Sequence, residues 1–152
     1  MGRDFIFPSE KRNSSRRILI RKRNRFEMDA KKLIREARKH LGEFTLSEKY
    51  LTAGSVAAAL TTKDGNIYTG ICLDMACGIG FCAEHSAIAE MLKHRETQIE
   101  MIVAVSKDGV LPPCGRCREL MLQVDGRNKD TKVLISRDKI VALRKLLPHP
   151  WR

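Results

Sequence analysis

Three thiols and one carboxylate in the second half of the chain are spaced in a way that suits metal chemistry. Cys82 and Glu84 stand two positions apart, and Cys114 and Cys117 form a C-x-x-C pair further along. Zinc at a catalytic site takes three protein ligands and keeps its fourth tetrahedral position open for water. Three thiolates would fill those three positions, and the ion would lower the pKa of the water toward neutrality. Glu84 lies too near Cys82 in sequence to be a comfortable further ligand, so we interpret it as the proton carrier.

Each thiol motif stands where a helix is expected to begin. Cys82 and Cys114 follow loop-like residues, and each opens a run with helical periodicity, over residues 82–94 and 114–124. A cysteine in the first helical turn lies at the positive end of the helix dipole, which favours its thiolate. A C-x-x-C alone is a weak signal, because redox pairs and structural zinc sites use it too. Its combination with C-x-E, each before a helix, is much more specific.

A closed structural zinc site is the alternative to an open catalytic one. Such a site needs a fourth protein ligand. The candidates in this chain are Cys72, Cys77 and His85.

Length, composition and charge favour one intracellular domain with a basic extension. The chain has 152 residues, a net charge of +11 and five cysteines, with no apolar run of membrane-spanning length. Residues 1–27 hold nine lysines or arginines against three acids. We interpret residues 1–27 as a solvated extension that could alternatively contact nucleic acid or an acidic partner, and residues 28–152 as the domain. The cytoplasm is the expected compartment.

The remaining pattern predicts helices packed around a mixed sheet. We expect a helix over 29–41, a second helical turn or a loop over 47–53, and strands over 55–62, 66–71, 101–106 and 132–136. A loop over 72–81 and a helix over 139–146 complete the predicted elements. This alternation is typical of an α/β fold with three layers, α/β/α. Both thiol-bearing helices would then point their N-termini at one spot on the sheet edge.

The motifs resemble those of the cytidine deaminase family, and within it the small tetrameric zinc nucleoside deaminases. Their residue sequence is most similar to that of blasticidin S deaminase. The landmarks are Val56–Leu60, Asp64–Gly70, Cys82–Glu84, Pro113–Arg118, and Leu146–Pro148 with Trp151. The resemblance implies a five-stranded mixed sheet, a Zn²⁺ ion on Cys82, Cys114 and Cys117, and Glu84 as the catalytic acid and base.

The resemblance also implies substrate contacts. The backbone amide of Ala83 would meet the pyrimidine carbonyl, and Trp151 would reach the base from a neighbouring subunit of a homotetramer or dimer. The alternative for Trp151 is C-terminal packing. Asp74 is the acid that survives in the segment where the family binds ribose, so it could hold a sugar hydroxyl or merely cap a loop.

Two residues beside the motifs bear on the charge of the thiolates. Arg118 matches an arginine that, in the family, donates a hydrogen bond to a thiolate sulfur. His85 stands where the family has another such arginine. This replacement would leave the negative charge of the thiolates less neutralised, or would make the site pH-sensitive. The alternative for His85 is simple packing or a neutral hydrogen bond.

The predicted function is hydrolytic deamination of a cytosine nucleoside, cytidine or deoxycytidine, with a cytosine nucleoside analogue such as blasticidin S as an alternative substrate. The expected partners are the small-molecule substrate and further copies of the chain, and neither nucleic acid nor a membrane. A polynucleotide deaminase is a rival, but such enzymes usually have histidine at the Cys82 position and aromatic-rich binding faces. A non-catalytic zinc module is the other rival.

Overall fold

The computed structural model describes residues 26–151, so the predicted extension over residues 1–27 lies almost wholly outside the described part. The first described element is a helix over residues 26–38. The later elements are β1 (Phe44–Thr45), β2 (Thr52–Thr62), β3 (Ile67–Asp74), η1 (Ala76–Gly78), α2 (Ala83–Lys93), β4 (Ile99–Ser106), β5 (Gly109–Leu111), α3 (Gly115–Val124), η2 (Gly126–Asp130), β6 (Lys132–Ser136), β7 (Lys139–Ala142) and α4 (Leu143–Leu146). No helix within 26–151 is long and apolar enough to cross a membrane.

The seven strands form one mixed sheet in five lateral positions. β3 pairs with one edge of β2 and β4 with the other, while β6 pairs with β4 and β7 with β6. The short strand β1 shares the β4 edge of β2, and β5 shares the β6 edge of β4. β4 and β6 run parallel, and the other pairs are antiparallel. The sequence pattern predicted four of these strands, and the resemblance implied five. The pattern missed β1 and β5 because they are too short to alternate, and it assigned the residues of β7 to a helix.

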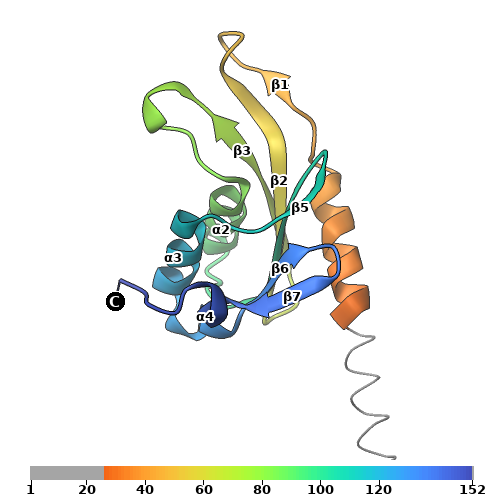
Figure 1. Ribbon diagram of the computed structural model, residues 1–152, viewed down its shortest axis with the longest axis vertical. Coiled ribbons are helices and arrows are strands. Elements are labelled where there is room, and N and C mark those ends of the chain that lie inside the picture. Colours follow the sequence, from red (N-terminus) through yellow and green to blue (C-terminus); the bar gives the residue numbers. More distant parts are fainter. Residues whose placement is uncertain (1–25, 152) are drawn as a thin grey trace, which may run out of the picture.

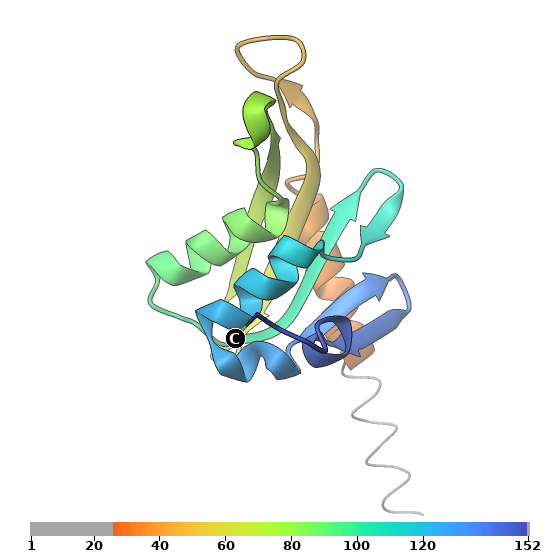
Figure 2. The ribbon, with the colours of Figure 1, turned by 60° about the vertical axis from the view of Figure 1, so that its left-hand side comes forward.

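Helices cover both faces of this sheet (Figures 1 and 2). Successive strand residues point to opposite faces, so β2 and β4 contribute to two separate cores. The N-terminal helix packs on one face through a buried cluster of Ala30, Leu33, Ala37, Ala57, Ala59, Met101, Val103, Val105 and Leu134. The other face carries α2, α3 and α4, whose buried cluster includes Ala58, Leu60, Ile102, Ala87, Ile88, Met91, Met121 and Leu143. The predicted three-layer α/β/α arrangement is therefore confirmed.

A glycine on β3 lets α2 lie close against the sheet. A Cβ atom at Gly70 would come 2.3 Å from the backbone nitrogen of Ala87 and 2.6 Å from the Cβ of Ser86. These partners are backbone or near-backbone atoms of α2, so they cannot move aside without shifting the helix. Gly70 thus sets the position of the helix that carries the first thiol motif.

Replacing Gly70 by alanine should lower the free energy of unfolding by about 3 kcal/mol, because the added methyl group overpacks the β3–α2 contact. Urea denaturation measures this directly. Gly126→Ala is the matched control, since a Cβ there would meet nothing within 4 Å, and it should change stability little. Equal effects of the two substitutions would contradict the close approach of α2.

Two predicted elements are wrong in their bounds or type. The residues predicted as one helix over 139–146 form β7 and then the four-residue helix α4. The β-branched pair Ile140–Val141 pairs with β6, and this pairing overrides the helical pattern. The N-terminal helix already includes Phe26, whose ring lies 3.9 Å from the Lys132 ammonium, so it does not begin at Asp29.

Asp125 holds the end of α3 through charge-assisted hydrogen bonds. Its carboxylate accepts from the Arg127 backbone at 2.9 Å, from the Arg127 guanidinium at 2.9 and 2.6 Å, and from the Thr97 hydroxyl at 2.8 Å. The hydrogen bonds from Arg127, the main cause, hold the pKa of Asp125 well below its usual range. A carboxyl with a lowered folded-state pKa stabilises the fold above the ordinary pKa and loses that contribution as pH falls.

Asp125→Asn should therefore cost about 1–2 kcal/mol of unfolding free energy at neutral pH. The difference from the unsubstituted protein should shrink between about pH 4 and pH 2, where the unfolded aspartate becomes protonated. Urea unfolding at several pH values checks both statements. Asp138→Asn in the exposed β6–β7 turn is the control. A gap that stays constant on acidification would show that the charge of Asp125 is not what stabilises this junction.

Candidate active site

The three predicted thiols lie at the N-terminal ends of α2 and α3. Cys82 is the N-cap of α2 and Cys114 is the N-cap of α3, both with extended backbone. Cys117 is fully buried in the first turn of α3. The two helices thus start at one place on the sheet, as the sequence predicted, and present their cysteines to each other.

The thiol separations suit a tetrahedral zinc ion. The Sγ atoms of Cys82 and Cys114 are 3.6 Å apart, and those of Cys114 and Cys117 are 3.4 Å apart. The Sγ atoms of Cys82 and Cys117 lie within 4.8 Å of each other. Zinc–sulfur bonds of about 2.3 Å in tetrahedral geometry place sulfurs roughly 3.8 Å apart. The donor set therefore fits zinc with little rearrangement.

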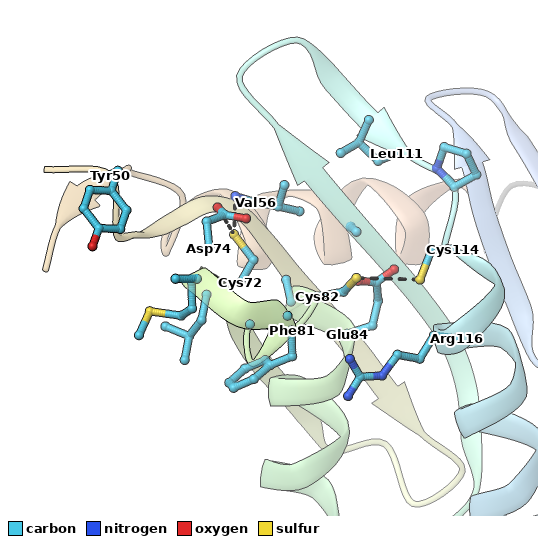
Figure 3. A pocket seen from close by; sticks show the side chains of 18 residues that line it. Tyr50, Val56, Cys72, Asp74, Phe81, Cys82, Glu84, Leu111, Cys114 and Arg116 are labelled. Carbon is cyan, nitrogen blue, oxygen red and sulfur yellow. Dashed lines mark hydrogen bonds between the residues drawn. The ribbon is translucent and has the colours of Figure 1, made fainter. Parts of the chain in front are cut away.

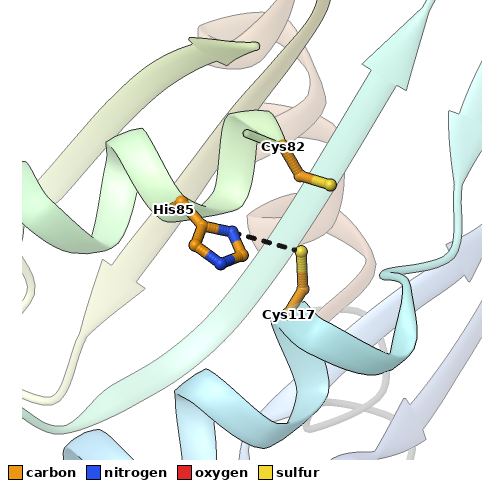
Figure 4. A group of neighbouring side chains, drawn as sticks. All are labelled: Cys82, His85 and Cys117. Carbon is orange, nitrogen blue, oxygen red and sulfur yellow. Dashed lines mark hydrogen bonds between the residues drawn. The ribbon is translucent and has the colours of Figure 1, made fainter. Parts of the chain in front are cut away.

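A fourth possible donor, His85, stands beside the thiols (Figure 4). Its Nδ1 lies 3.5 Å from the Cys117 Sγ, and Cys82, His85 and Cys117 form a group whose ligand atoms are mutually within 4.8 Å. Burial, and then the nearby positive charge of Arg116, lowers the pKa of His85. A neutral imidazole can either donate a hydrogen bond to a thiolate or bind a metal. The other candidates for a fourth ligand, Cys72 and Cys77, lie outside this group among residues 26–151.

Two of the three thiols tend to stay protonated as long as no cation is bound beside them. Burial raises the pKa of Cys82, and burial together with the nearby Glu84 charge strongly raises that of Cys117. At Cys114 burial acts in the same direction, but the amides of Cys117 and Arg116 and the neighbouring thiols outweigh it and lower the pKa. Buried thiols that resist ionisation become thiolates when a metal ion supplies the compensating charge.

Glu84 is a nearly buried carboxylate directly beside the sulfurs. Its side chain is 5% exposed, and Figure 3 shows it next to the sulfurs of Cys82 and Cys114. Burial raises the pKa of Glu84, although its own backbone amide and a hydrogen bond with Cys117 act in the opposite direction. A carboxyl with a raised pKa exchanges protons more readily near neutral pH, which suits general acid–base catalysis.

Cys82, Cys114 and Glu84 form one end of a pocket of about 630 Å³, and the fully buried Cys117 does not line it. Cys82, Ala83, Glu84 and Cys114 line that end, and Asp74 lies at the other, beyond Cys72 (Figure 3). The remaining lining is mainly apolar, with Tyr50, Val56, Leu73, Met75, Ala76, Gly78, Gly80, Phe81, Ala104, Leu111 and Pro112, together with Arg116. The pocket is large enough for a small nucleoside-sized molecule.

Residues 28–133 match the family model described as the cytidine and deoxycytidylate deaminase zinc-binding region. The chain belongs to this family. A cytidine deaminase from Halalkalibacterium halodurans is 31% identical over 111 residues, which cover 71% of this chain and 80% of that protein. The chain is thus a zinc-dependent deaminase of the cytidine deaminase family.

Solved structures of cytidine deaminases share the fold. The crystal structure of the Mycobacterium tuberculosis protein superimposes with a TM-score of 0.69 at 24% identity, over 82% of this chain and 98% of that one. The structure of the Burkholderia pseudomallei protein gives a TM-score of 0.63 at 26% identity, over 78% and 96%. These likenesses confirm the predicted α/β fold class.

Two residues predicted for the site of this deaminase, Arg118 and Trp151, do not line the pocket of their own chain. Arg118 donates from Nε to the Pro113 carbonyl at 2.9 Å and from Nη1 to the Leu146 carbonyl at 3.0 Å. It therefore ties the start of α3 to the C-terminal segment, and a contact from Arg118 to a thiolate stays a prediction. Trp151 is 71% exposed and does not line the pocket of its own chain, so its contact with a base also stays a prediction.

Arg116 is the pocket residue that the sequence analysis missed. It lies inside the C-x-x-C pair and lines the pocket (Figure 3), and its positive charge contributes to lowering the pKa of His85. The signal was available, because the residue after an N-cap and its neighbour often project past the end of the helix. Arg116 supplies positive charge next to a thiolate-rich site, which such a site needs.

Proposed function

We propose that this enzyme hydrolyses the 4-amino group of a cytosine nucleoside, cytidine or deoxycytidine, to give the uracil nucleoside and ammonia. The observation that carries the proposal is the grouping of three thiols and the buried Glu84 at one end of a nucleoside-sized pocket. The relative from Halalkalibacterium halodurans is named a cytidine deaminase, which supports the same substrate class. A cytosine analogue such as blasticidin S is not favoured by the comparisons.

Within this proposal, Cys82, Cys114 and Cys117 hold the zinc ion, which when bound supplies an activated water molecule for attack on carbon 4 of the ring. Glu84 accepts the proton of that water and delivers it to ring N3. Glu84 then assists proton delivery to the departing amino group, so that ammonia leaves and the carboxylate is regenerated. The backbone N–H of Ala83, at the first turn of α2, orients the ring by donating to its carbonyl oxygen.

His85 has a supporting role in this assignment. Its Nδ1 stands 3.5 Å from the Cys117 Sγ, a separation at which Nδ1–H donates to a thiolate. That bond spreads the negative charge of the sulfur without occupying a metal position. With His85 in this role, the three cysteines would hold the ion and a water molecule could take the fourth position; Cys82 and Cys114 line the pocket and His85 does not.

The experiment is a substrate panel with the purified, zinc-loaded protein. The panel contains cytidine, deoxycytidine, blasticidin S, free cytosine and a single-stranded oligonucleotide, and ammonia release and the loss of cytosine absorbance are followed. We expect turnover of the two nucleosides. Turnover of the oligonucleotide alone would instead support the polynucleotide deaminase, and a metal-loaded protein inactive on every cytosine compound would refute the substrate class.

We further propose a homotetramer or dimer located in the cytoplasm, with residues 28–152 as the catalytic domain and residues 1–27 as its basic extension. The exposed indole of Trp151, outside the pocket of its own chain, supports its use by a neighbouring subunit. Sedimentation velocity tests the assembly. A protein that stays monomeric at working concentration and is fully active would rule out a shared site.

A further inference from the structure

Arg118 joins the start of α3 to the C-terminal segment, residues 146–151, through two carbonyl groups. Its Nε donates to the Pro113 oxygen at 2.9 Å, and its Nη1 donates to the Leu146 oxygen at 3.0 Å. Pro113 is buried and Arg118 is half-buried. Hydrogen bonds from a charged guanidinium are stronger than those between neutral groups, and its planar shape fixes their directions. One side chain therefore holds two segments that are far apart in the sequence.

Both carbonyls stand where their own helices offer no donor. Pro113 precedes Cys114, the N-cap of α3, so its oxygen lies outside the hydrogen bonds of that helix. Leu146 is the last residue of α4, and the final carbonyls of a helix have no partner within it. A backbone carbonyl that is shielded from water and unpaired costs free energy, so the two bonds from Arg118 stabilise both segments.

The bond to Pro113 bears directly on the backbone of Cys114. Because the peptide unit is planar, the Pro113 oxygen and the Cys114 nitrogen and Cα move together. The proline ring already restricts the φ angle of Pro113 to a narrow range. Rotation of this peptide plane is the freedom that remains, and the bond from Arg118 to its oxygen limits that rotation. Arg118 thus fixes the backbone that carries the Cys114 thiol, whose sulfur lies 3.6 Å from that of Cys82.

A second contact holds the C-terminal segment to α3. The Trp151 backbone N–H donates to Glu119 Oε2 at 3.4 Å. At its other end the segment leaves α4, where the fully buried Leu143 donates its backbone N–H to the Thr131 carbonyl at 3.0 Å. Figures 1 and 2 show the segment running from α4 toward α3. The position of Trp151 therefore depends on two adjacent residues of α3, Arg118 and Glu119.

We propose that Arg118 is a positioning residue that couples zinc binding at Cys114 to the C-terminal segment. The inference rests on the proposed role of Cys114 as a zinc ligand. A metal-bound Cys114 holds the Pro113 peptide plane still, and the fixed plane keeps the guanidinium directed at Leu146. Such coupling is reciprocal, so zinc steadies the segment by the same factor as the segment favours zinc. Zinc occupancy thereby acts on Trp151, the residue that we propose a neighbouring subunit uses.

The test uses Trp151 as a probe, because it is the only tryptophan in the chain. Removal of zinc from the unsubstituted protein by a chelator should lower the fluorescence anisotropy of Trp151, and added zinc should restore it. Arg118→Lys keeps the charge but has one nitrogen in place of the two that donate here, so it cannot reproduce both bonds. This variant should show the low anisotropy with and without zinc, and should release zinc to the chelator about 10-fold faster.

The matched control is Arg144→Lys. Arg144 lies on α4 and pairs with Asp130, so its variant should behave like the unsubstituted protein in both measurements. All samples are compared at a concentration where sedimentation velocity gives the same assembly. A general loss of stability would be seen in urea unfolding and would not remove the response of Trp151 to zinc selectively.

Two results would overturn the inference while leaving the proposed deamination intact. One is zinc release from Arg118→Lys as slow as from the unsubstituted protein. The other is an anisotropy of Trp151 in the unsubstituted protein that does not respond to zinc, a measurement that needs no variant to fold. Retention of zinc by Cys114→Ala would instead overturn the ligand assignment on which the inference rests.

Discussion

Glu84→Gln should abolish deamination while the protein keeps its zinc. Glutamine fills the same buried space, 5% exposed in the unsubstituted protein, but cannot take a proton from water or pass one to the ring. The loss of this proton transfer should lower kcat by roughly 10³-fold. Because Glu84 is not a ligand in this account, zinc content by atomic absorption should stay at one ion per chain.

The matched control for this prediction is Glu90→Gln on the same helix. Glu90 is half-exposed and paired with Lys93 at 2.7 Å, at the end of α2 away from the thiols. Its substitution should leave both turnover and zinc unchanged. Substantial turnover by Glu84→Gln would remove Glu84 from its catalytic role, and loss of zinc from that variant would make it a ligand.

The second prediction distinguishes two possible sets of zinc ligands. One set is Cys82, Cys114 and Cys117, and the other has His85 in place of Cys114. Cys114→Ala should lose zinc and all turnover, because the remaining thiols, Cys82 and Cys117, cannot hold the ion tightly. His85→Ala should retain zinc at one ion per chain, since we assign His85 a hydrogen bond to Cys117 and not a metal bond. Loss of such a supporting hydrogen bond typically weakens metal affinity or activity by about 10- to 100-fold.

Zinc stoichiometry after dialysis and release to a chelator measure both variants, with Cys77→Ala as the control. Cys77 is an exposed thiol outside the cluster, so its variant should match the unsubstituted protein. The opposite outcome, with zinc kept by Cys114→Ala and lost by His85→Ala, would establish Cys82, His85 and Cys117 as the ligands. Loss of zinc from both variants would favour a closed four-ligand site.

The sequence predicted the site well where short-range rules apply. A cysteine at a helix start is readable because the change from a loop to helical periodicity is local, and this placed Cys82 and Cys114 at the N-caps of α2 and α3. The buried strand β4 could be predicted equally well, because a strand covered on both faces has a nearly continuous apolar sequence.

The sequence could not predict features that depend on pairing between distant segments. The local pattern of the β7 residues predicts a helix, and only their pairing with β6 makes them a strand. β2 has a bulge between Ala53 and Ala57 that arises from its register with β3. The Ser55 hydroxyl, which lies in this bulge, donates a hydrogen bond to the Asp74 carboxylate at 2.8 Å. The bond from Arg118 to the Leu146 carbonyl likewise joins segments whose proximity is set by the tertiary structure.

The central claim is that three thiolates hold one zinc ion and leave its fourth position open beside Glu84. X-ray absorption at the zinc edge of the purified enzyme counts the ligands by element and distance. The account predicts three sulfurs at about 2.3 Å and one oxygen at about 2.0–2.2 Å. Two sulfurs with a histidine nitrogen would contradict the ligand assignment, and three sulfurs with a histidine nitrogen would contradict the open position on which catalysis depends.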